Sequence, residues 1–237
     1  MPPTQPFTDR SDAGRRLAER LAEWPGLDPA GDHPPVVVLA LPRGGVPVAA
    51  PVAAALHAPL DVLAVRKVGV PGRLELAMGA VASGGIRVRH PRAIARSGLD
   101  PDEVEAAFRR AEEELAERER RWRGEGPPPD LTGRMVVLVD DGLATGSSMH
   151  AAVEAVRARH PAAVVVAVPV APGVTVSELR RVADDVVCLR VPARFIAVSP
   201  HYLDFTQVGD EAVRCMLHPP MGGDDAESRS APDGAPG

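Results

Sequence analysis

The sequence predicts an α/β protein in which helices flank a central parallel β-sheet. Short apolar runs rich in valine and leucine alternate with segments of helical periodicity, and turn residues bound each run. Such runs are typical of buried parallel strands, and their alternation with helices predicts right-handed βαβ crossovers. The 237 residues are enough for one domain, or for one domain with an insertion. The runs cover residues 35–41, 60–65, 135–139, 162–170 and 185–191.

The first helix lies near the N-terminus. Residues 1–6 are polar, and we expect them to be disordered. Residues 11–24 have the apolar spacing of an amphipathic helix, which we expect to cover the sheet; the alternative is a role in substrate binding. A linker rich in proline, glycine and aspartate follows at 26–35.

The strand at 35–41 ends in the sequence Pro42, Arg43, Gly44, Gly45, which precedes an apolar helix. Two glycines after a strand let the backbone approach a ligand closely, and the N-terminus of the following helix attracts anions. Taken alone, this short pattern fits a purely structural turn between strand and helix equally well.

The strand at 60–65 is followed by two cations, Arg66 and Lys67. Lys67 is the only lysine among the 27 basic residues, which indicates a need for a compact ammonium group that contacts an anionic group such as phosphate. The alternative is a strand end whose charges simply face solvent.

The segment 69–85 is rich in glycine, which is typical of a loop that closes over a site. Within it, residues 76–82 have the pattern of a strand that forms a hairpin with Ile86 and Val88, and both interpretations can hold together.

A long charged helix is expected at 100–122, because Asp100, Pro101 and Glu103 form a start signal. Its narrow apolar stripe should lie against the core or against a partner subunit. The apolar residues of this stripe are Val104, Phe108, Ala111 and Leu115.

The most informative stretch reads MVVLVDDGLATGSSM and covers residues 135–149. A buried strand ends at Asp140 and Asp141, whose carboxylates can accept hydrogen bonds from vicinal hydroxyl groups. The small residues that follow open a helix, and its unpaired backbone N–H groups suit a phosphate. Carboxylates for a diol beside donors for a phosphate describe a site for ribose 5-phosphate.

This stretch resembles the phosphoribosyl pyrophosphate (PRPP) motif of type I phosphoribosyltransferases. The resemblance is closest to the bacterial stand-alone "predicted phosphoribosyltransferase" group and covers about 7–217. It implies a single-domain, Rossmann-like fold with an inserted flexible loop and long helix at about 69–130. A small C-terminal hood is expected at about 192–217. The tail 218–237 should be disordered, because it is rich in proline, glycine, aspartate and serine.

The resemblance also implies a reaction, the Mg²⁺-dependent transfer of the 5-phosphoribosyl group of PRPP to a nitrogenous acceptor with release of pyrophosphate. Asp140 and Asp141 would hold the ribose hydroxyls and also Mg²⁺, the metal largely through PRPP and water. Arg73 and Glu75 of the flexible loop are candidates to close over the site. The phosphate is assigned to Ala144, Thr145, Gly146, Ser147 and Ser148, and the leaving pyrophosphate to Arg43, Gly44, Gly45, Arg66 and Lys67.

The hood is expected to hold the acceptor. Residues 195–205 contain two of the four phenylalanines and the only tyrosine, which makes Phe195, Tyr202 and Phe205 candidates for acceptor binding. The alternative is that these rings only pack a C-terminal lobe. In the hypoxanthine-guanine branch an acid occupies the place of Ala144, so a 6-oxopurine acceptor is disfavoured. The orotate branch tolerates alanine there, but the loop lacks that branch's lysine, and the acceptor stays open.

Composition excludes several classes of partner. The net charge of −5 and the lack of a basic run argue against nucleic acid, and Cys188 and Cys215 lack the spacing of a disulfide framework or zinc site. Proline and charge interrupt every apolar run, and the N-terminus lacks a signal-peptide segment, so we expect a cytoplasmic protein without a membrane span.

Two other functions fit part of the pattern. A response-regulator receiver domain also begins with a strand and paired acids, but Asp184 and Asp185 precede their strand and no lysine follows Lys67. A regulatory protein that binds PRPP or a nucleotide without turnover is the remaining alternative. By analogy with the family, the chain is expected to form a homodimer, with the long helix as a plausible contact.

Overall fold

The computed structural model describes residues 5–24, 34–70, 73–124 and 126–218. Residues 1–4 and 219–237, which the sequence predicts to be disordered, lie outside the described residues. Most of the expected linker at 26–35 also lies outside them. The same holds for the side chains of Arg73 and Glu75.

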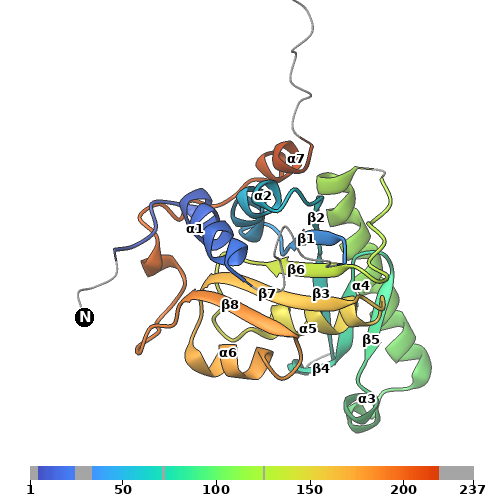
Figure 1. Cartoon of the computed structure of the whole chain (residues 1–237). Helices are drawn as coiled ribbons and strands as arrows, with labels where there is room; N and C mark the ends of the chain where they lie inside the picture. Colours follow the sequence, from blue (N-terminus) through green and yellow to red (C-terminus); the bar gives the residue numbers. More distant parts are fainter. Residues whose placement is uncertain (1–4, 25–33, 71–72, 125, 219–237) are drawn as a thin grey trace, which may run out of the picture.

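A parallel sheet forms the centre of the molecule, as the sequence predicts. Its strand order is β2-β1-β6-β7-β8, and every neighbouring pair is parallel (Figure 1). The strands are β1 (Val36–Ala40), β2 (Leu60–Val62), β6 (Met135–Val139), β7 (Ala163–Val170) and β8 (Asp185–Arg190). β1 and β6 lie side by side, so their carboxyl ends and the loops that follow them meet at one edge.

Helices cover both faces of this sheet (Figure 1). Because strand side chains alternate, Val38 and Val137 face the layer that contains α1, whereas Val37 and Val136 face the layer that contains α5. The first layer is α1 (Arg10–Ala22) with α2 (Gly45–Ala55), and the second is α5 (Ser147–Arg157) with α6 (Gly173–Leu179).

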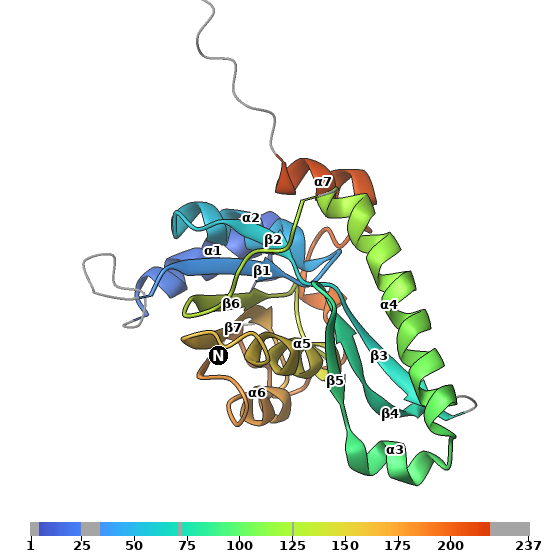
Figure 2. The ribbon, with the colours of Figure 1, turned by 90° about the vertical axis from the view of Figure 1, so that its right-hand side faces the viewer.

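Residues 65–123 form a second unit, here called the arm, that extends from the carboxyl edge of the sheet (Figure 2). Its three antiparallel strands are in the order β3-β4-β5, which confirms the predicted hairpin of residues 76–82 with Ile86 and Val88. The arm comprises β3 (Val65–Val70), β4 (Arg73–Ala82), β5 (Ile86–Arg89), α3 (Pro91–Ser97) and α4 (Pro101–Arg123). The short α3 was not predicted, because none of its residues is buried and it has no apolar stripe.

The expected strand at 60–65 proved to be two strands of different sheets. Ala64 lies between the two strands, and Ser83 of the arm binds it. The Ser83 Oγ accepts a hydrogen bond from the Ala64 N–H at 2.8 Å, and the Ser83 N–H donates to the Ala64 carbonyl at 2.9 Å. The chain therefore leaves the parallel sheet after Val62. Arg66 and Lys67 lie within β3 rather than at the carboxyl end of a parallel strand.

The long helix α4 packs on the strands of its own arm. Asp100 and Glu103 form a capping box at its start, as the sequence predicts. Arg87 of β5 pairs with Glu112 of α4 and, at 3.0 Å, with Glu105. The apolar stripe that was the expected dimer contact is buried within the chain; its residues are Val104, Phe108, Ala111 and Leu115.

The C-terminal segment returns over the first helical layer. It contains a 3-10 turn, η2 (Ser199–His201), and a closing helix, α7 (Asp210–Leu217). Phe7 and Tyr202 form a parallel bridge, which joins the two ends of the described chain. Among the described residues, none of the helices combines the length and apolar content needed to cross a membrane.

Gly14 lets α1 approach α2 closely, and replacing it with alanine should destabilise the fold. A Cβ atom there would lie 2.4 Å from the Val48 carbonyl oxygen and 2.5 Å from Cγ of Pro51. We expect Gly14→Ala to lower the free energy of unfolding by about 1–3 kcal/mol in urea titrations. Glu19→Ala, on the exposed side of α1, is the control and should change it by less than about 0.5 kcal/mol. Equal stability of the two variants would contradict the close helix contact.

Candidate active site

The paired acids, Asp140 and Asp141, and the glycine loop, residues 42–45, meet at the carboxyl edge of the sheet. The Leu41 N–H, just after β1, donates to the carbonyl of Val139 at 2.8 Å, which joins the two strand ends. A Cβ atom on Gly44 would lie 2.1 Å from Oδ2 of Asp141. Any side chain at position 44 would therefore collide with the carboxylate of Asp141, so glycine permits the close approach of the two loops.

Asp141 is held from two directions by residues far away in the sequence. Nε of Arg10 lies 2.8 Å from its Oδ2, and the side chains of both residues are largely buried, 11% and 15% exposed. The Tyr202 hydroxyl donates to the Asp141 carbonyl at 2.5 Å. The guanidinium of Arg10 also lies 3.8 Å from the centre of the Phe205 ring. These contacts fix the position of Asp141 and largely neutralise its charge.

Asp140 is the acid of the pair that lines cavities. Its Oδ1 accepts a hydrogen bond from the Asp141 N–H at 2.8 Å, and the residue lines two cavities. Burial raises its pKa well above the usual range of a carboxyl group, and the neighbouring charge of Asp141 raises it further. Burial also raises the pKa of Asp141, although Arg10 opposes that shift. A cation or a set of donors placed beside Asp140 would favour its charged form.

The first cavity is lined by the predicted phosphate loop, residues 144–148. It encloses about 200 Å³ between Asp140 and the start of α5, and its lining is Gly142, Leu143, Ala144, Thr145, Gly146, Ser147, Ser148 and Met149. Gly146, the N-cap residue of α5, has no side chain to cap the helix, and the Ser147 N–H makes only a long hydrogen bond of 3.5 Å to Oγ1 of Thr145. The first turn of α5 therefore suits an anion. The hydroxyl of Thr175 donates to the Ala144 carbonyl at 2.8 Å and anchors the loop.

The second cavity lies between Pro42, at the start of the glycine loop, and the arm, and it encloses about 150 Å³. Its lining does not include Arg43, Gly44 or Gly45. Asp140 and Ser148 line this cavity as well as the first, so the two spaces meet at these side chains. The other lining residues are Leu41, Pro42, Leu63, Ala64, Val65, Leu115, Arg118 and Trp122. Paired spaces on either side of one carboxylate can accept the two ends of an elongated anionic molecule.

Residues 10–204 match the phosphoribosyl transferase domain, which is most of the chain. The chain belongs to the phosphoribosyltransferase family. Two Mycobacterium tuberculosis proteins named as candidate phosphoribosyl transferases, from strains CDC 1551 and H37Rv, are each 47% identical over 211 residues. The match covers 89% of this chain but 46% of each relative, so the chain spans about half of their length.

The crystal structure of TT1426 from Thermus thermophilus is also similar. It is 47% identical, has a TM-score of 0.77, and covers 90% of this chain and 98% of its own. Together with the domain match, this similarity confirms the family that the PRPP motif indicates and the α/β fold with a central parallel sheet.

The structure separates the three cations that the family resemblance assigned to pyrophosphate. Arg43, after a cis peptide bond with Pro42, has its Nη1 3.5 Å from Asp210 of α7. Arg66 pairs with Glu114 of α4 at 2.6 Å. Lys67, the next residue of β3, lines a third cavity of about 290 Å³ that also contains Thr145 and Ser147 of the phosphate loop.

The aromatic residues of the expected hood differ in their environment. Tyr202 is 6% exposed and packs against Phe7 and Phe205, as the packing alternative predicts for it. Phe205 is half-buried beneath Arg10. Phe195 is half-buried, and its ring stacks on His201 with 6.0 Å between ring centres. Acceptor binding by these residues stays a prediction, with Phe195 and Phe205 the more accessible of the three.

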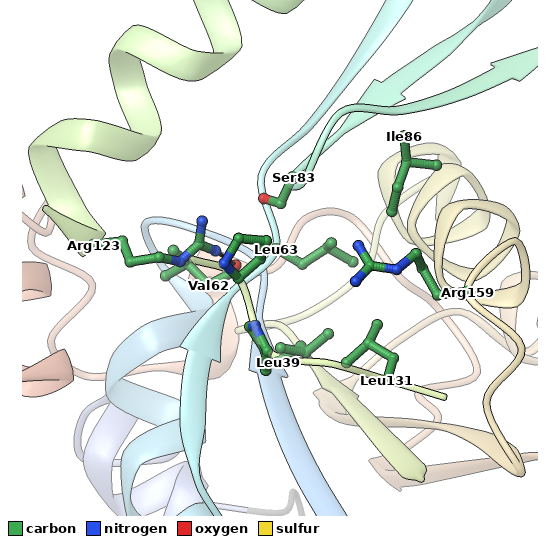
Figure 3. A pocket seen from close by; sticks show the side chains of 10 residues that line it. Leu39, Val62, Leu63, Ser83, Ile86, Arg123, Leu131 and Arg159 are labelled. Atoms are coloured by element: carbon green, nitrogen blue, oxygen red, sulfur yellow. Dashed lines mark hydrogen bonds between the residues drawn. The ribbon is translucent and has the colours of Figure 1, made fainter. Parts of the chain in front are cut away.

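A small cavity of about 10 Å³ lies where the arm joins the sheet (Figure 3). Arg123 and Arg159 approach it from opposite sides, with Leu39, Leu63 and Ser83 between them (Figure 3). None of the predicted site residues lines it, and its volume is about that of a single water molecule. It is therefore part of the joint between arm and sheet.

Sequence reasoning missed Arg10, Thr175 and Arg118. All three touch the site from elements remote in sequence, and the first and last are single arginines in arginine-rich helices. No local pattern distinguishes them from their neighbours. Only the packing of α1, α6 and α4 brings them to the acid pair, the phosphate loop and the second cavity.

Arg10→Met should destabilise the protein because it leaves the buried carboxylate of Asp141 unpaired beside Asp140. We expect a loss of about 3 kcal/mol in urea unfolding. In a background that already carries Asp141→Asn, the same replacement should cost much less, because no charge is left unpaired. Arg16→Met, at a side chain that is 46% exposed, is the control. A cost that does not depend on residue 141 would contradict the role given to this ion pair.

Proposed function

We propose that this protein transfers the 5-phosphoribosyl group of PRPP to a nitrogenous acceptor, such as a nucleobase, and releases pyrophosphate. The observation that supports this most strongly is the position of Asp140 between two cavities. One cavity ends at the N-terminus of α5 and suits the 5-phosphate, while the other borders the glycine loop and suits the diphosphate. The ribose would lie between them, with its hydroxyl groups at Asp140.

In the proposed reaction, the bond between the anomeric carbon and the diphosphate oxygen breaks, and its electron pair leaves with pyrophosphate. The lone pair of the acceptor nitrogen forms the new carbon–nitrogen bond, and the proton of that nitrogen passes to water. Positive charge develops on the ribose ring near Asp140, which stabilises it, while donors and cations stabilise the leaving group.

Magnesium fits the site as a metal carried mainly by the substrate. The part of the chain that the structure describes contains no cluster of three or more histidine, cysteine or acidic side chains able to hold a metal ion. Mg²⁺ usually binds through one or two carboxylates together with substrate phosphates and water. Asp140 would supply the carboxylate, since Asp141 is occupied by Arg10. When bound, the metal would neutralise charge on the diphosphate.

Calorimetric titration of PRPP, with and without Mg²⁺, tests this proposal. We expect binding that depends on Mg²⁺, followed by pyrophosphate release when a suitable base or amine is added. Magnesium-dependent binding without turnover across a broad set of acceptors would favour the regulatory alternative. Failure to bind PRPP under either condition would overturn the proposed function.

Asp140→Asn should weaken Mg²⁺-dependent PRPP binding by about tenfold or more, because an amide cannot ligate the metal or accept two hydroxyl hydrogen bonds as well as a carboxylate does. The fold should survive, since a neutral group is easier to bury than a charged one. Asp130→Asn, at an exposed aspartate in the loop before β6, is the matched control. Equal affinities of the two folded variants for PRPP, measured by calorimetry, would contradict the role of Asp140.

Lys67 lies with Thr145 and Ser147, so we now expect its ammonium group to act on the 5-phosphate rather than on the leaving group. Lys67→Ala should weaken ribose 5-phosphate binding by about tenfold and pyrophosphate binding less, with Lys67→Arg as the charge-preserving control. Competition with PRPP would measure both affinities. A larger loss for pyrophosphate would instead place Lys67 on the leaving-group side.

A further inference from the structure

The second cavity receives three side chains from one face of α4. Leu115, Arg118 and Trp122 are spaced at i, i+3 and i+7, so they lie on the same side of the helix. Leu115 and Trp122 are 5% and 7% exposed, and the indole Nε1 of Trp122 donates to Asp210 at 2.9 Å. These two buried residues fix the rotation of α4, and that rotation brings Arg118 to the rim of the cavity.

The cavity needs a cation that the expected residues do not readily supply. A diphosphate carries several negative charges, and it would lie in the same space as the carboxyl group of Asp140. Arg66 pairs with Glu114, and Arg43 lies near Asp210. Lys67 lines the third cavity, together with Thr145 and Ser147, and not the second.

Arg118 is available for this purpose. Its side chain is exposed, and within the described residues no ion pair, hydrogen bond or ring contact engages it. A guanidinium group has a planar set of donors that matches phosphate oxygens in pairs, so an arginine is well suited to bind a diphosphate.

We propose that Arg118 of α4 binds the diphosphate of PRPP and stabilises it as a leaving group. The inference rests on the proposed function, since it names a further binding residue for the same reaction. As the bond from the anomeric carbon to oxygen breaks, its electron pair moves onto the diphosphate, and the guanidinium of Arg118 interacts with the added charge. In this arrangement the arm contributes a side chain directly to the reaction.

The test compares Arg118→Ala with Arg120→Ala. Arg120 is also exposed and lies two positions further along α4, on nearly the opposite face, so both variants lose the same charge from the same helix. Calorimetry with inorganic pyrophosphate plus Mg²⁺, and separately with ribose 5-phosphate, measures the two halves of the site. Circular dichroism and urea unfolding confirm that both variants are folded.

Arg118→Ala should weaken pyrophosphate binding by about tenfold or more and leave ribose 5-phosphate binding within about twofold. Arg118→Lys should recover part of the loss, because it restores the charge without the paired donors. Arg120→Ala should bind both ligands as the unaltered protein does.

Two results would overturn the inference, and they are distinguishable. If the unaltered protein binds pyrophosphate and PRPP while both alanine variants bind them equally well, the role of Arg118 is wrong and the proposed function stands. If the unaltered protein binds neither ligand, the proposed function falls and the inference falls with it.

Discussion

The site depends on the close approach of two loops that follow neighbouring parallel strands. The main chain at Gly44 lies against the carboxylate of Asp141, and a single added methyl group there would collide with it. Because β1 and β6 are paired along their whole length, this contact is set by the sheet and not by the loops themselves. It places a helix N-terminus, two acids and the glycine loop within one narrow edge, while Lys67 and Arg118 reach the cavities from the arm.

Two acids with the same sequence environment take different roles. Arg10 and Tyr202 hold Asp141 in place, so its carboxylate serves mainly to position the strand end. Asp140 borders both of the cavities proposed to hold PRPP, and burial raises its pKa. The Asp141 N–H and the nearby Arg10 oppose this shift, and the proposed ligand, with its hydroxyl groups and metal, would favour the charged form further. In the proposed function, ligand binding and ionisation of Asp140 would therefore be coupled.

The core of the fold and the phosphate loop could be predicted from the sequence, because strand patterning and loop chemistry are local properties. The run that ends at Asp140 is a buried strand, and the small residues after it open α5 as expected. The predictions that failed depend on contacts between residues far apart in the sequence. Hydrogen bonds between Ala64 and Ser83 accompany the early end of β2, and Arg66 and Lys67 lie in the arm. Arg10, Thr175 and Arg118 reach the site only through helix packing, which no local pattern encodes.

The most direct test of the central claim is a crystal structure of the protein with PRPP and Mg²⁺. We expect the 5-phosphate at the backbone N–H groups of residues 145–148, the ribose hydroxyls at Asp140, and the diphosphate between Pro42 and Arg118. A PRPP molecule bound in the reverse direction, or bound away from Asp140, would contradict the two-cavity interpretation on which the proposed function is built.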